Sequence, residues 1–463
     1  MQERIQEYYE SFANKQVVFC GIGVSHQQLI EKFASFGAKV TACDKRTKEE
    51  LGDLYDKYTQ KGITLILGEG YMDNLQGDVI FRTPGIHYHH PSLVKAREQG
   101  IPVTSEMEEF FKLCPAPIFA VTGSDGKTTT TSIICELLKT TGKTVHLGGN
   151  IGTPLLPVVE TISSNDYVVV ELSSFQLMSM RKGPAVSVVT NVAPNHLDVH
   201  KDMDEYIEAK TNIFRYQETN SKTVLNLENE ITRNFSDKVN GTVSFFSHLQ
   251  SVKNGCYCKD DTIYAVYDEK ETLVISCKDI KLPGAHNIQN YMAAIAAVWG
   301  LVSVENIQKV AKEFGGVEHR IEFVRELNGV RWYNDSIATS PTRAIAGLNS
   351  FPQKQIIIAG GYDKHIPFDP FAQKAIEKIK ILILTGDTSD AIENCVKNQD
   401  GYSSDVIEIV RAASMEEAVQ IAYQKAKAGD IVSLSPACAS FDRYPNFAVR
   451  GRHYKQLVEE LKD

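Results

Sequence analysis

The stretch "IFAVTGSDGKTTTTSIICELL", residues 118–138, constrains the fold more than any other part of the chain. An apolar strand leads through a glycine-rich turn into a helix that opens with Lys127 and Thr128. The backbone N–H groups of such a turn point at phosphate oxygens, and the helix dipole also favours negative charge there. Lys127 would place a positive charge beside the β- and γ-phosphates, and the Thr128 hydroxyl would bind Mg²⁺. The stretch therefore predicts an α/β domain that binds a nucleotide.

The turn is shorter than a full Walker motif, which has four residues between its two glycines. Here only Ser124 and Asp125 lie between Gly123 and Gly126. The order Gly-Lys-Thr between a strand and a helix still favours ATP binding over a purely structural turn that is capped by threonines. We expect ATP to contact Gly123, Ser124, Asp125, Gly126, Lys127, Thr128 and Thr129.

Size and composition limit the remaining function classes. A length of 463 residues predicts roughly three domains. The net charge of −9 argues against a nucleic-acid partner, which needs a basic surface. No apolar run approaches the ~18–20 residues of a membrane span, and the first residues lack the apolar region of a signal peptide. Because the nine cysteines are scattered as well, we expect a cytoplasmic protein with no membrane partner.

The order of predicted elements indicates an α/β fold. Short β-branched runs alternate with helical patterns along most of the chain, which is typical of parallel sheets covered by helices. We place three domains at 1–107, 108–317 and 318–463. Residues 242–279 contain strands but little helix, so we expect a small antiparallel sheet on the central domain. In the third domain the predicted strands are "VRWYNDS", "QIIIAGG", "KILILTG", "DVIEIV" and "DIVSLSP".

A second glycine turn, "GIGVSH", runs from Gly21 to His26 after a predicted strand. Asp44 ends the next strand about 20 residues further on, as in dinucleotide-binding domains. His26 stands where those domains have a third glycine, which permits close packing of helix on strand, so nicotinamide binding is disfavoured. Many parallel α/β domains also carry a GxG turn for structural reasons. Nucleotide-type binding and a structural turn both stay open here.

Several polar residues follow other predicted strands. Glu171 ends the apolar strand of "YVVVELSSFQ", and ligands of open parallel sheets collect at such strand ends, so we expect Glu171 to bind Mg²⁺. His196 and His200 in "TNVAPNHLDVH" lie four residues apart, without a third zinc ligand at matching spacing. Paired surface histidines are the commoner outcome, yet His196 is also a candidate ligand for the same metal as Glu171. The glycines before Asn150 in "HLGGNIGTP" either let the backbone approach a ligand or form an ordinary loop.

Nine motifs, in order, resemble the Mur ligase family over essentially the whole chain. They are "TGSDGKTTT", "GGNIGTP", "ELSSFQL", "TNVAPNHLD", "LPGAHNIQN", "EHRIEFV", "YNDSIATSP", "AGGYDKHIPF" and "LSPACASFDRYPNFAVRG". The last four resemble the D-glutamate-adding members best. The resemblance implies a Rossmann-like UDP-binding domain, a central P-loop ATPase domain with a parallel sheet plus a small antiparallel sheet, and a Rossmann-like C-terminal domain. It also accounts for the shortened phosphate loop.

The resemblance assigns roles residue by residue. The implied catalytic residues are Lys127, His196 and Lys210. The implied ligands of two Mg²⁺ ions are Thr128, Glu171, His196 and Lys210 as a carbamate. Beyond the phosphate loop, the implied ATP contacts are Asn287, Asn290, Arg320 and Asp335. The implied contacts of the UDP-linked substrate are Val24, Ser25, Asp44, Arg46, Thr83, Pro84, Gly85, Asn150 and Ser173, and those of D-glutamate are Thr339, Lys364, Ser435 and Phe447.

A carbamate at Lys210 sets a chemical condition on its surroundings, because CO₂ reacts only with the neutral amine. At the usual lysine pKa of about 10.4, roughly four side chains in ten thousand are neutral at pH 7. The site must therefore lower the pKa of Lys210 or stabilise the carbamate through metal and hydrogen bonds.

The chain departs from the family pattern at Ile337, where many members have a lysine that contributes to D-glutamate binding. An isoleucine side chain cannot pair with a carboxylate. We expect Lys364 to be the principal cationic contact for D-glutamate, with Arg343 as a candidate replacement for the missing charge.

The resemblance implies an ATP-dependent ligase that adds D-glutamate to UDP-N-acetylmuramoyl-L-alanine through an acyl phosphate, as a monomer in peptidoglycan precursor synthesis. One alternative is another Mur-type or a folate polyglutamate ligase, although the glycine turn ahead of the phosphate loop favours a separate UDP-binding domain. Another is a nicotinamide-dependent oxidoreductase, which would not need Lys127 and is disfavoured by His26. A purely structural or regulatory ATP-binding protein is the weakest alternative.

Overall fold

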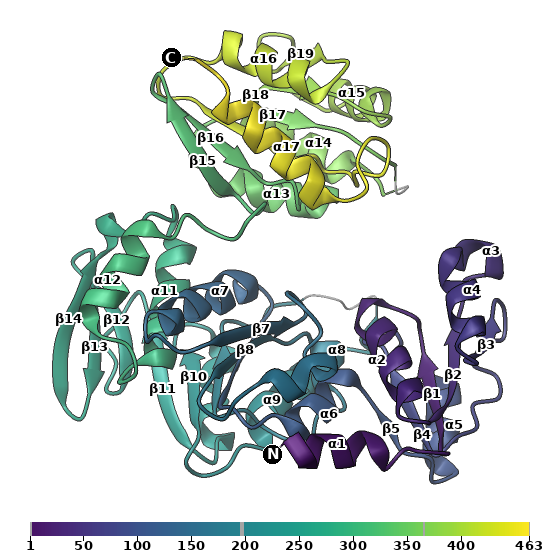
Figure 1. Ribbon diagram of the computed structural model, residues 1–463. Coiled ribbons are helices and arrows are strands. Elements are labelled where there is room, and N and C mark those ends of the chain that lie inside the picture. Colours follow the sequence, from purple (N-terminus) through teal and green to yellow (C-terminus); the bar gives the residue numbers. More distant parts are fainter. Residues whose placement is uncertain (1, 195–198, 364–365, 463) are drawn as a thin grey trace. The chain divides into compact units, whose positions relative to one another are not determined.

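The computed structural model describes residues 2–194, 199–363 and 366–462 (Figure 1). The chain forms two compact units. The first comprises Met1–Ile280 and Ala285–Lys312, and the second comprises Lys281–Gly284 and Glu313–Asp463. Two of the predicted site residues, His196 and Lys364, lie outside the described residues.

The first unit begins with a five-stranded sheet in which every pair is parallel. Its strand order is β3-β2-β1-β4-β5. The strands are β1 (Gln16–Cys20), β2 (Lys39–Asp44), β3 (Thr64–Leu67), β4 (Val79–Arg82) and β5 (Val103–Thr104). The helices of this region are α1 (Gln2–Glu10), α2 (Val24–Ser35), α3 (Lys48–Leu51), α4 (Asp53–Gln60), α5 (Pro91–Glu98) and α6 (Glu106–Leu113).

The same unit contains a nine-stranded sheet of order β14-β13-β12-β11-β10-β9-β6-β8-β7. The strands are β6 (Ile118–Thr122), β7 (Val145–Gly149), β8 (Tyr167–Glu171), β9 (Val186–Val189), β10 (Lys222–Asn226), β11 (Thr242–Ser247), β12 (Gly255–Lys259), β13 (Thr262–Tyr267) and β14 (Lys270–Ser276). The helices are α7 (Lys127–Lys139), η1 (Leu156–Thr161), α8 (Ser174–Leu177), α9 (Met203–Arg215), α10 (Glu230–Arg233), η2 (Ser236–Lys238), η3 (Cys277–Asp279), α11 (Ala285–Val298) and α12 (Val304–Glu313).

The expectation of a small antiparallel sheet at 242–279 is confirmed only in part. Strands β12, β13 and β14 are antiparallel to one another, but they extend the parallel sheet, because β11 pairs in parallel with both β10 and β12. Gly255 permits this continuation. A Cβ at Gly255 would lie 1.8 Å from the carbonyl oxygen of Phe245, so only a glycine lets β12 approach β11 this closely.

The two sheets of the first unit share one apolar core. Buried side chains of the first region, such as Tyr9 and Phe33, belong to the same cluster as Leu156 and Val168 of the second. The hydroxyl of Tyr9 donates to the carbonyl oxygen of Leu156 at 3.0 Å. The division that we predict at residue 107 falls inside α6, between the two sheets, and it stays a prediction.

The second unit contains a six-stranded sheet of order β15-β16-β20-β17-β18-β19. The strands are β15 (Glu322–Leu327), β16 (Val330–Asn334), β17 (Gln355–Ala359), β18 (Ile379–Leu384), β19 (Glu408–Arg411) and β20 (Ile431–Leu434). The helices are α13 (Pro341–Asn349), α14 (Asp369–Lys378), α15 (Ser389–Lys397), α16 (Met415–Lys425) and α17 (Phe447–Glu459). The five strands predicted for this region are confirmed. The strand β15, which joins the edge of the sheet antiparallel to β16, was not predicted from the sequence.

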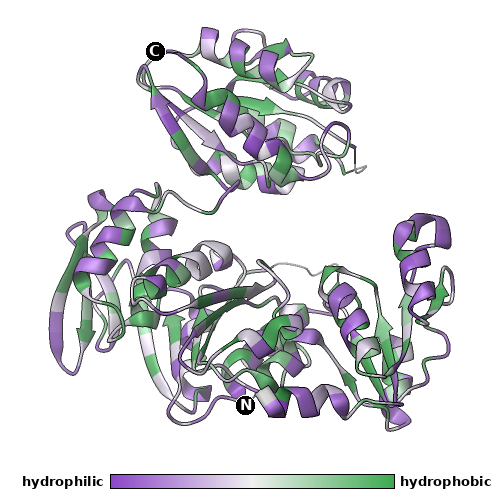
Figure 2. Cartoon of the chain, in the orientation of Figure 1, coloured by the Kyte–Doolittle hydropathy of each residue, from purple (hydrophilic) through white to green (hydrophobic). Residues whose placement is uncertain are grey.

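Strand composition explains the layers. The strands are mostly hydrophobic, whereas the helices alternate between hydrophobic and hydrophilic residues (Figure 2). Strands β6, β8 and β17 are buried along their whole length, as expected for parallel strands that are covered on both faces. None of the described helices is long and apolar enough to cross a membrane.

Candidate active site

Two glycines let the phosphate loop fit between neighbouring segments. Gly123 has a φ of +150°, and a Cβ there would lie 1.9 Å from Oγ1 of Thr190. Gly126 has a φ of +77°, and a Cβ there would lie 2.4 Å from Oδ1 of Asn290. Both values fall in the range of φ that favours glycine. The loop is therefore held directly against Asn290, one of the predicted ATP contacts.

Lys127 begins α7 and lies over this loop. Its Nζ atom donates to the carbonyl oxygens of Gly123 at 3.0 Å and Ser124 at 2.9 Å. The Ser124 hydroxyl lies 3.0 Å from the hydroxyl of Tyr206 and donates to the carbonyl oxygen of Ala193 at 2.9 Å. The cation and the loop that carries it are thus held in place by hydrogen bonds, which is the preorganisation that phosphate binding needs. Tyr206 is a contributor that the sequence analysis missed.

Glu171 connects three segments at the carboxyl edge of the central sheet. It ends β8 and is 1% exposed. Its Oε2 accepts from the Thr128 hydroxyl at 2.7 Å, and its Oε1 accepts from the side-chain amide of Asn150 at 2.8 Å. Strands β6, β7 and β8 are parallel and adjacent, so the segments that follow them meet at one edge of the sheet. Glu171 therefore lies beside the phosphate loop, where we predict that it binds Mg²⁺.

The side chains at this edge fit a magnesium ion. Mg²⁺ prefers hard oxygen ligands and is usually held by one or two carboxylates with hydroxyls, waters and phosphates. Thr128 and Glu171 supply a hydroxyl and a buried carboxylate that are already in contact. The third ligand that we predict, His196, lies outside the described residues.

Lys210 lies beneath the phosphate loop, on α9. It is 1% exposed, and its Nζ donates to the carbonyl oxygen of Gly123 at 2.9 Å. The pKa of Lys210 lies well below its usual value, mainly because the amine is buried and also because Lys127 carries a like charge nearby. A larger fraction of the amine is therefore neutral here than in an exposed lysine. The direction of this shift is the one that carbamate formation requires.

His200, the second histidine of the pair noted in the sequence, lies in a polar network. Its Nε2 is 2.8 Å from the Ser174 hydroxyl, and its Nδ1 is 3.0 Å from a carboxylate oxygen of Glu205. Its ring stacks on Phe175 with 4.9 Å between the ring centroids. His200 is fully buried at the side chain and is bound to its neighbours.

The two asparagines that we predict to contact ATP lie together on α11. The side-chain amide of Asn290 donates to Oδ1 of Asn287 at 3.1 Å, and Oδ1 of Asn290 accepts from the Thr130 hydroxyl at 3.2 Å. Thr130 lies one turn into α7, so this contact ties α11 to the helix that follows the phosphate loop. The structure therefore brings both asparagines to the predicted nucleotide site.

A cavity of about 280 Å³ opens between the loops of the first and central sheets. Of the predicted substrate contacts, its described lining includes Val24, Ser25, Thr83, Pro84 and Asn150. The rest of the lining consists of Gly23, Ser105, Glu106, Met107, Gly149, Ile151, Gly152, Pro154 and Gln176. Among the described residues, Asp44, Arg46, Gly85 and Ser173 lie outside this lining.

Asp44 and Arg46 hold the first glycine turn in place. The Asp44 carboxylate accepts from the backbone N–H of Ile22 at 2.6 Å and from the Arg46 guanidinium at 2.9 Å. Burial alone would raise the pKa of Asp44, but these hydrogen bonds outweigh it and hold the pKa below its usual value. His26 packs in the place of the third glycine, with its ring edge-on to Phe19 at 5.2 Å between centroids. Asp44 and Arg46 therefore fix the shape of the turn, while its residues Gly23, Val24 and Ser25 line the cavity, so nucleotide-type binding at the turn stays a prediction.

Glu106 and Gln176 line the cavity but were not among the predicted residues. The buried Glu106 carboxylate accepts from the backbone N–H groups of Leu155 and Leu156, each at 2.9 Å. Gln176 and Ser173 form the capping box of α8, so Ser173 acts as a helix cap. The capping pattern Ser-x-x-Gln is readable from sequence, whereas the partner of Glu106 is about fifty residues away and only the fold reveals it.

In the second unit, two predicted residues meet at the carboxyl ends of β16 and β20. The Ser435 hydroxyl donates to a carboxylate oxygen of Asp335 at 3.1 Å, and the backbone N–H of Ile321 donates to the other oxygen at 3.3 Å. Burial raises the pKa of Asp335 to about 7. Ile321 directly follows Arg320, so this bond ties the segment that carries the predicted ATP arginine to Asp335.

Arg343 lies close to the position of the missing lysine. Its guanidinium donates to the backbone carbonyl oxygen of Ile337 at 3.4 Å. Thr339 lies two residues further along the same segment, and its backbone N–H donates to the same carbonyl oxygen at 2.7 Å. A positive charge is therefore present beside Ile337 although residue 337 itself is apolar.

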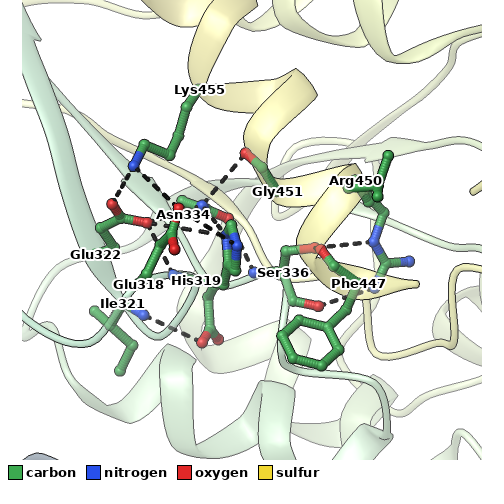
Figure 3. Close-up of polar contacts among 12 residues, drawn as sticks. Glu318, His319, Ile321, Glu322, Asn334, Ser336, Phe447, Arg450, Gly451 and Lys455 are labelled. Atoms are coloured by element: carbon green, nitrogen blue, oxygen red, sulfur yellow. Dashed lines mark hydrogen bonds and ion pairs between the residues drawn. The ribbon is translucent and has the colours of Figure 1, made fainter. Parts of the chain in front are cut away.

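Arg450 organises the other side of this region and was missed in the sequence, although "NFAVRG" contains it. It is 3% exposed, and its guanidinium donates to the carbonyl oxygen of Ser336 at 2.9 Å (Figure 3). It also donates to the carbonyl oxygens of Ala439 at 3.0 Å and Cys438 at 3.1 Å. The Ser336 hydroxyl donates in turn to the carbonyl oxygen of Phe447 at 2.8 Å. Phe447, a predicted D-glutamate contact, is thus held at the start of α17.

His319 fixes the turn ahead of Arg320. Its φ is +67°, which is unusual outside glycine, and its Nδ1 lies 2.9 Å from the side-chain amide of Asn334 (Figure 3). Its backbone N–H donates to the Glu322 carboxylate at 2.8 Å. Gly451 leaves space for the ring, because a Cβ there would lie 2.2 Å from Nδ1 of His319. These contacts stabilise the strained backbone conformation at His319, the residue directly before Arg320.

Comparisons with known proteins agree with these sites. A family model described as the Mur ligase middle domain matches residues 121–298. A second model, described as the Mur ligase, glutamate ligase domain, matches residues 319–438. The first region contains the phosphate loop, Glu171 and Lys210, and the second contains Arg320 and Asp335.

Curated relatives match over the full length. A UDP-N-acetylmuramoylalanine--D-glutamate ligase of Acetivibrio thermocellus is 51% identical over 466 residues, covering 100% of both chains. Enzymes of the same name from Clostridium botulinum (strain 657 / Type Ba4) and Clostridium novyi are 49% and 48% identical over 462 residues, again covering 100% of both chains.

Solved structures show the same fold at lower identity. The crystal structure of a UDP-N-acetylmuramate-alanine ligase from Thermotoga maritima has a TM-score of 0.56 at 20% identity, covering 97% of this chain and 100% of that chain. A pseudomurein peptide ligase type C from Methanothermus fervidus has a TM-score of 0.53 at 20% identity with the same coverage. The phosphate loop, the carboxylate beside it and the matches along the whole chain lead to one conclusion: the chain belongs to the Mur ligase family.

Proposed function

We propose that this chain is an ATP-dependent ligase that joins D-glutamate to UDP-N-acetylmuramoyl-L-alanine in the synthesis of peptidoglycan precursors. The observation that carries the proposal is the identity of about half of all residues, over the full length, to relatives named UDP-N-acetylmuramoylalanine--D-glutamate ligase. ATP and UDP-linked sugars are cytoplasmic compounds, so we place the reaction in the cytoplasm.

A free carboxylate does not react with an amine, since it has no leaving group and its charge is delocalised. We therefore propose that the carboxylate of the UDP-linked substrate attacks the γ-phosphorus of ATP, so that ADP leaves and an acyl phosphate forms. The amine of D-glutamate then attacks the carbonyl carbon, and phosphate leaves as the amide bond forms. Exclusion of water is needed while the acyl phosphate exists.

The residues of the phosphate loop suit the first step. Lys127 and the loop N–H groups would bind the β- and γ-phosphates, and Thr128 and Glu171 would hold Mg²⁺ beside them. When bound, Mg²⁺ offsets the negative charge that develops on the phosphoryl oxygens. Asn287 and Asn290 would bind the nucleoside from α11, and Arg320 and Asp335 are the other two ATP contacts that we predict.

The buried amine of Lys210 is suited to carbamate formation. CO₂ would add to the neutral amine with release of one proton, which gives a carboxylate-like group below the phosphate loop. Burial and the charge of Lys127 favour that neutral form. A ¹³C NMR signal from protein equilibrated with ¹³CO₂, absent in a Lys210→Arg variant, would support the carbamate. A spectrum without any difference between the two proteins would contradict it.

The UDP-linked substrate would occupy the cavity of about 280 Å³, with its nucleotide against Val24, Ser25, Thr83 and Pro84 and its peptide arm toward Asn150. D-glutamate would bind in the second unit near Thr339, Ser435 and Phe447. Lys364, outside the described residues, would supply its main positive contact. Arg343 would add a second charge beside Ile337.

Phosphate release from ATP tests the proposal. The purified chain is incubated with ATP, Mg²⁺ and UDP-N-acetylmuramoyl-L-alanine, and D-glutamate, L-glutamate, L-lysine or diaminopimelate is added in turn. We expect release only when both the UDP-linked substrate and D-glutamate are present. Release with L-lysine or diaminopimelate would indicate another Mur-type ligase. Rapid ATP turnover without either substrate would contradict the proposed coupling.

A further inference from the structure

Two histidines and a glutamate from distant parts of the first unit converge at one place, which we call the His–His–Glu cluster: His87, His200 and Glu205. His87 lies in the loop after β4, and Glu205 lies in the first turn of α9. One ligand atom from each of the three residues lies within 4.8 Å of the other two. The individual distances to the Glu205 carboxylate are 3.0 Å from Nδ1 of His200 and 3.6 Å from Nε2 of His87.

One atom of this cluster lacks a hydrogen bond. The Nε2 atom of His87 is buried and has no hydrogen-bond partner within the described part of the chain, since 3.6 Å is too long for one. Buried polar atoms are almost always paired, so an exception calls for an explanation. Here the unpaired nitrogen faces a carboxylate oxygen and a second imidazole, which is the arrangement of a metal site.

His200 already has the orientation of a metal ligand. A metal-bound histidine usually bonds through its second ring nitrogen to a nearby polar group, which fixes its tautomer. In His200 that second nitrogen is Nε2, 2.8 Å from the Ser174 hydroxyl, and the stacked ring of Phe175 prevents rotation. Nδ1 is left facing Glu205, and a bound metal would replace the proton that these two groups share.

His87 requires a change of tautomer. Its Nδ1 accepts from the backbone N–H of His89 at 3.2 Å, which leaves the ring proton on Nε2. Metal binding at Nε2 would release that proton and protonate Nδ1. The bond from His89 is solvent-exposed, so its N–H group can bond to water instead.

Two imidazole nitrogens and one carboxylate oxygen are a ligand set of Zn²⁺, with a fourth position for water or another side chain. His89 is the nearest candidate for that position, since its Nε2 lies 4.0 Å from Glu205 and its side chain is 56% exposed. We propose that the His–His–Glu cluster binds Zn²⁺ and thereby fastens the loop after β4 to the start of α9. The loop residues Thr83 and Pro84, which line the substrate cavity, lie just ahead of His87.

The experiment measures Zn²⁺ affinity of the full chain by competition with a chelating dye, in excess Mg²⁺ to keep the site at Glu171 occupied. We expect one Zn²⁺ per chain, and we expect His87→Ala and Glu205→Gln each to weaken binding at least about ten-fold, the smallest loss usual for groups that only support a ligand. His453→Ala is the matched control. His453 also pairs with a glutamate, at 3.2 Å from Glu416, but no described third ligand joins that pair.

Thermal unfolding gives a second readout that does not depend on the dye. Zn²⁺ should raise the Tm of the wild-type chain and of the His453→Ala variant, because a ligand that binds the folded state stabilises it. The same Zn²⁺ concentration should raise the Tm of His87→Ala by less, because this variant binds the ion more weakly. His87 is partly exposed, so this variant should fold, and its circular dichroism spectrum checks that. A wild-type chain that binds no Zn²⁺, or variants that bind it with wild-type affinity, would overturn the proposal.

Discussion

At the scale of single residues, buried polar side chains determine how the site is held. Glu171 accepts from Thr128 and from Asn150, and Lys210 donates to the loop carbonyl of Gly123. Each of these bonds joins segments that are at least twenty residues apart in the sequence. Charged and amide groups that are buried away from water need hydrogen-bond partners within the protein. The residues of the site therefore also stabilise the fold around it.

His26 predicts a pH dependence of stability. Burial lowers its pKa to about 4, from about 6.5 when exposed, and the neutral ring donates through Nδ1 to the carbonyl oxygen of Gly21 at 2.7 Å. The unfolded chain therefore binds a proton at His26 between about pH 6.5 and pH 4, whereas the folded chain does not. Stability from this residue is present above pH 6.5 and is lost as the pH falls through that window.

The comparison with His26→Gln isolates this contribution. Between pH 7 and pH 4, the free energy of unfolding of the wild type should fall by about 3 kcal/mol more than that of the variant, since one pKa unit corresponds to about 1.4 kcal/mol. Urea unfolding at several pH values measures both. Parallel pH profiles for the two proteins would show that His26 is not the titrating group.

Arg343 predicts an effect on one substrate only. If its guanidinium replaces the charge missing at Ile337, an Arg343→Ala variant should have a KM for D-glutamate raised about ten-fold, with the KM for ATP unchanged. The loss corresponds to about 1.4 kcal/mol, close to the range for one hydrogen bond between charged groups. Initial rates at varied D-glutamate measure it.

The control for that experiment is Arg411→Ala. Arg411 forms exposed ion pairs with Asp390 and Glu393 in the same unit, so its loss should leave both KM values unchanged. An Arg343→Ala variant with the wild-type KM for D-glutamate would assign the whole cationic contact to Lys364.

At the scale of elements, short segments are positioned by distant side chains. The helix η1 begins at Leu156 and follows the loop that carries Asn150. The N–H group of Leu156, the first of the helix, and that of Leu155 just before it both donate to the buried carboxylate of Glu106 on α6. Free N–H groups at a helix start favour a negatively charged partner, which explains the acidic residue in an apolar setting.

Glu106 therefore acts as a positioning residue for the substrate cavity. A Glu106→Ala variant would leave two buried N–H groups unpaired, which costs about 1–3 kcal/mol for each group. We expect a lower Tm and a raised KM for the UDP-linked substrate, with the KM for ATP unchanged. Glu106→Gln keeps an acceptor oxygen and should recover most of both losses. If Glu106→Gln were as impaired as Glu106→Ala, the negative charge itself would be needed.

At the scale of the first unit, a single arginine joins two sheets. Arg82 ends β4 and is 1% exposed. Its guanidinium donates to the carbonyl oxygen of Phe175 at 2.7 Å and to the Ser179 hydroxyl at 2.9 Å, both in or just after α8. Another bond, at 3.1 Å, reaches the carbonyl oxygen of Ile86 in the loop that follows β4. Arg82 thus fastens the first sheet to the central sheet.

Removal of Arg82 should weaken this attachment. In an Arg82→Ala variant the acceptors of three buried or partly buried bonds lose their donor, and we expect the free energy of unfolding to fall by about 3–5 kcal/mol, since each acceptor left unpaired costs about 1–3 kcal/mol. Calorimetry should show a lower first transition. Arg4→Ala is the control, because Arg4 makes one exposed bond to the carbonyl oxygen of Lys112 and should change stability by less than about 0.5 kcal/mol. Equal Tm values for the two variants would contradict this role of Arg82.

The sequence by itself determined the local units of this protein. The strand–turn–helix of residues 118–138 follows from an apolar run, from glycines and from a lysine at the helix start, all of which act over a few residues. The α/β class follows in the same way from alternating strands and helices. Glu171 was identified because a strand end marks the ligand edge of a parallel sheet.

Only the tertiary structure decided which distant residues meet. The continuation of the central sheet through β11 to β14 depends on the fit of Gly255 against Phe245, and the edge strand β15 has no strong local pattern. Glu106, Arg82 and Arg450 bond to residues that are far from them in the sequence. The spacing of His87 and Glu205 in the sequence does not predict that they lie together. Local propensity depends on residues that are neighbours in sequence. Burial and tertiary hydrogen bonds depend on residues that are neighbours in space, and these neighbours are defined only once the chain has folded.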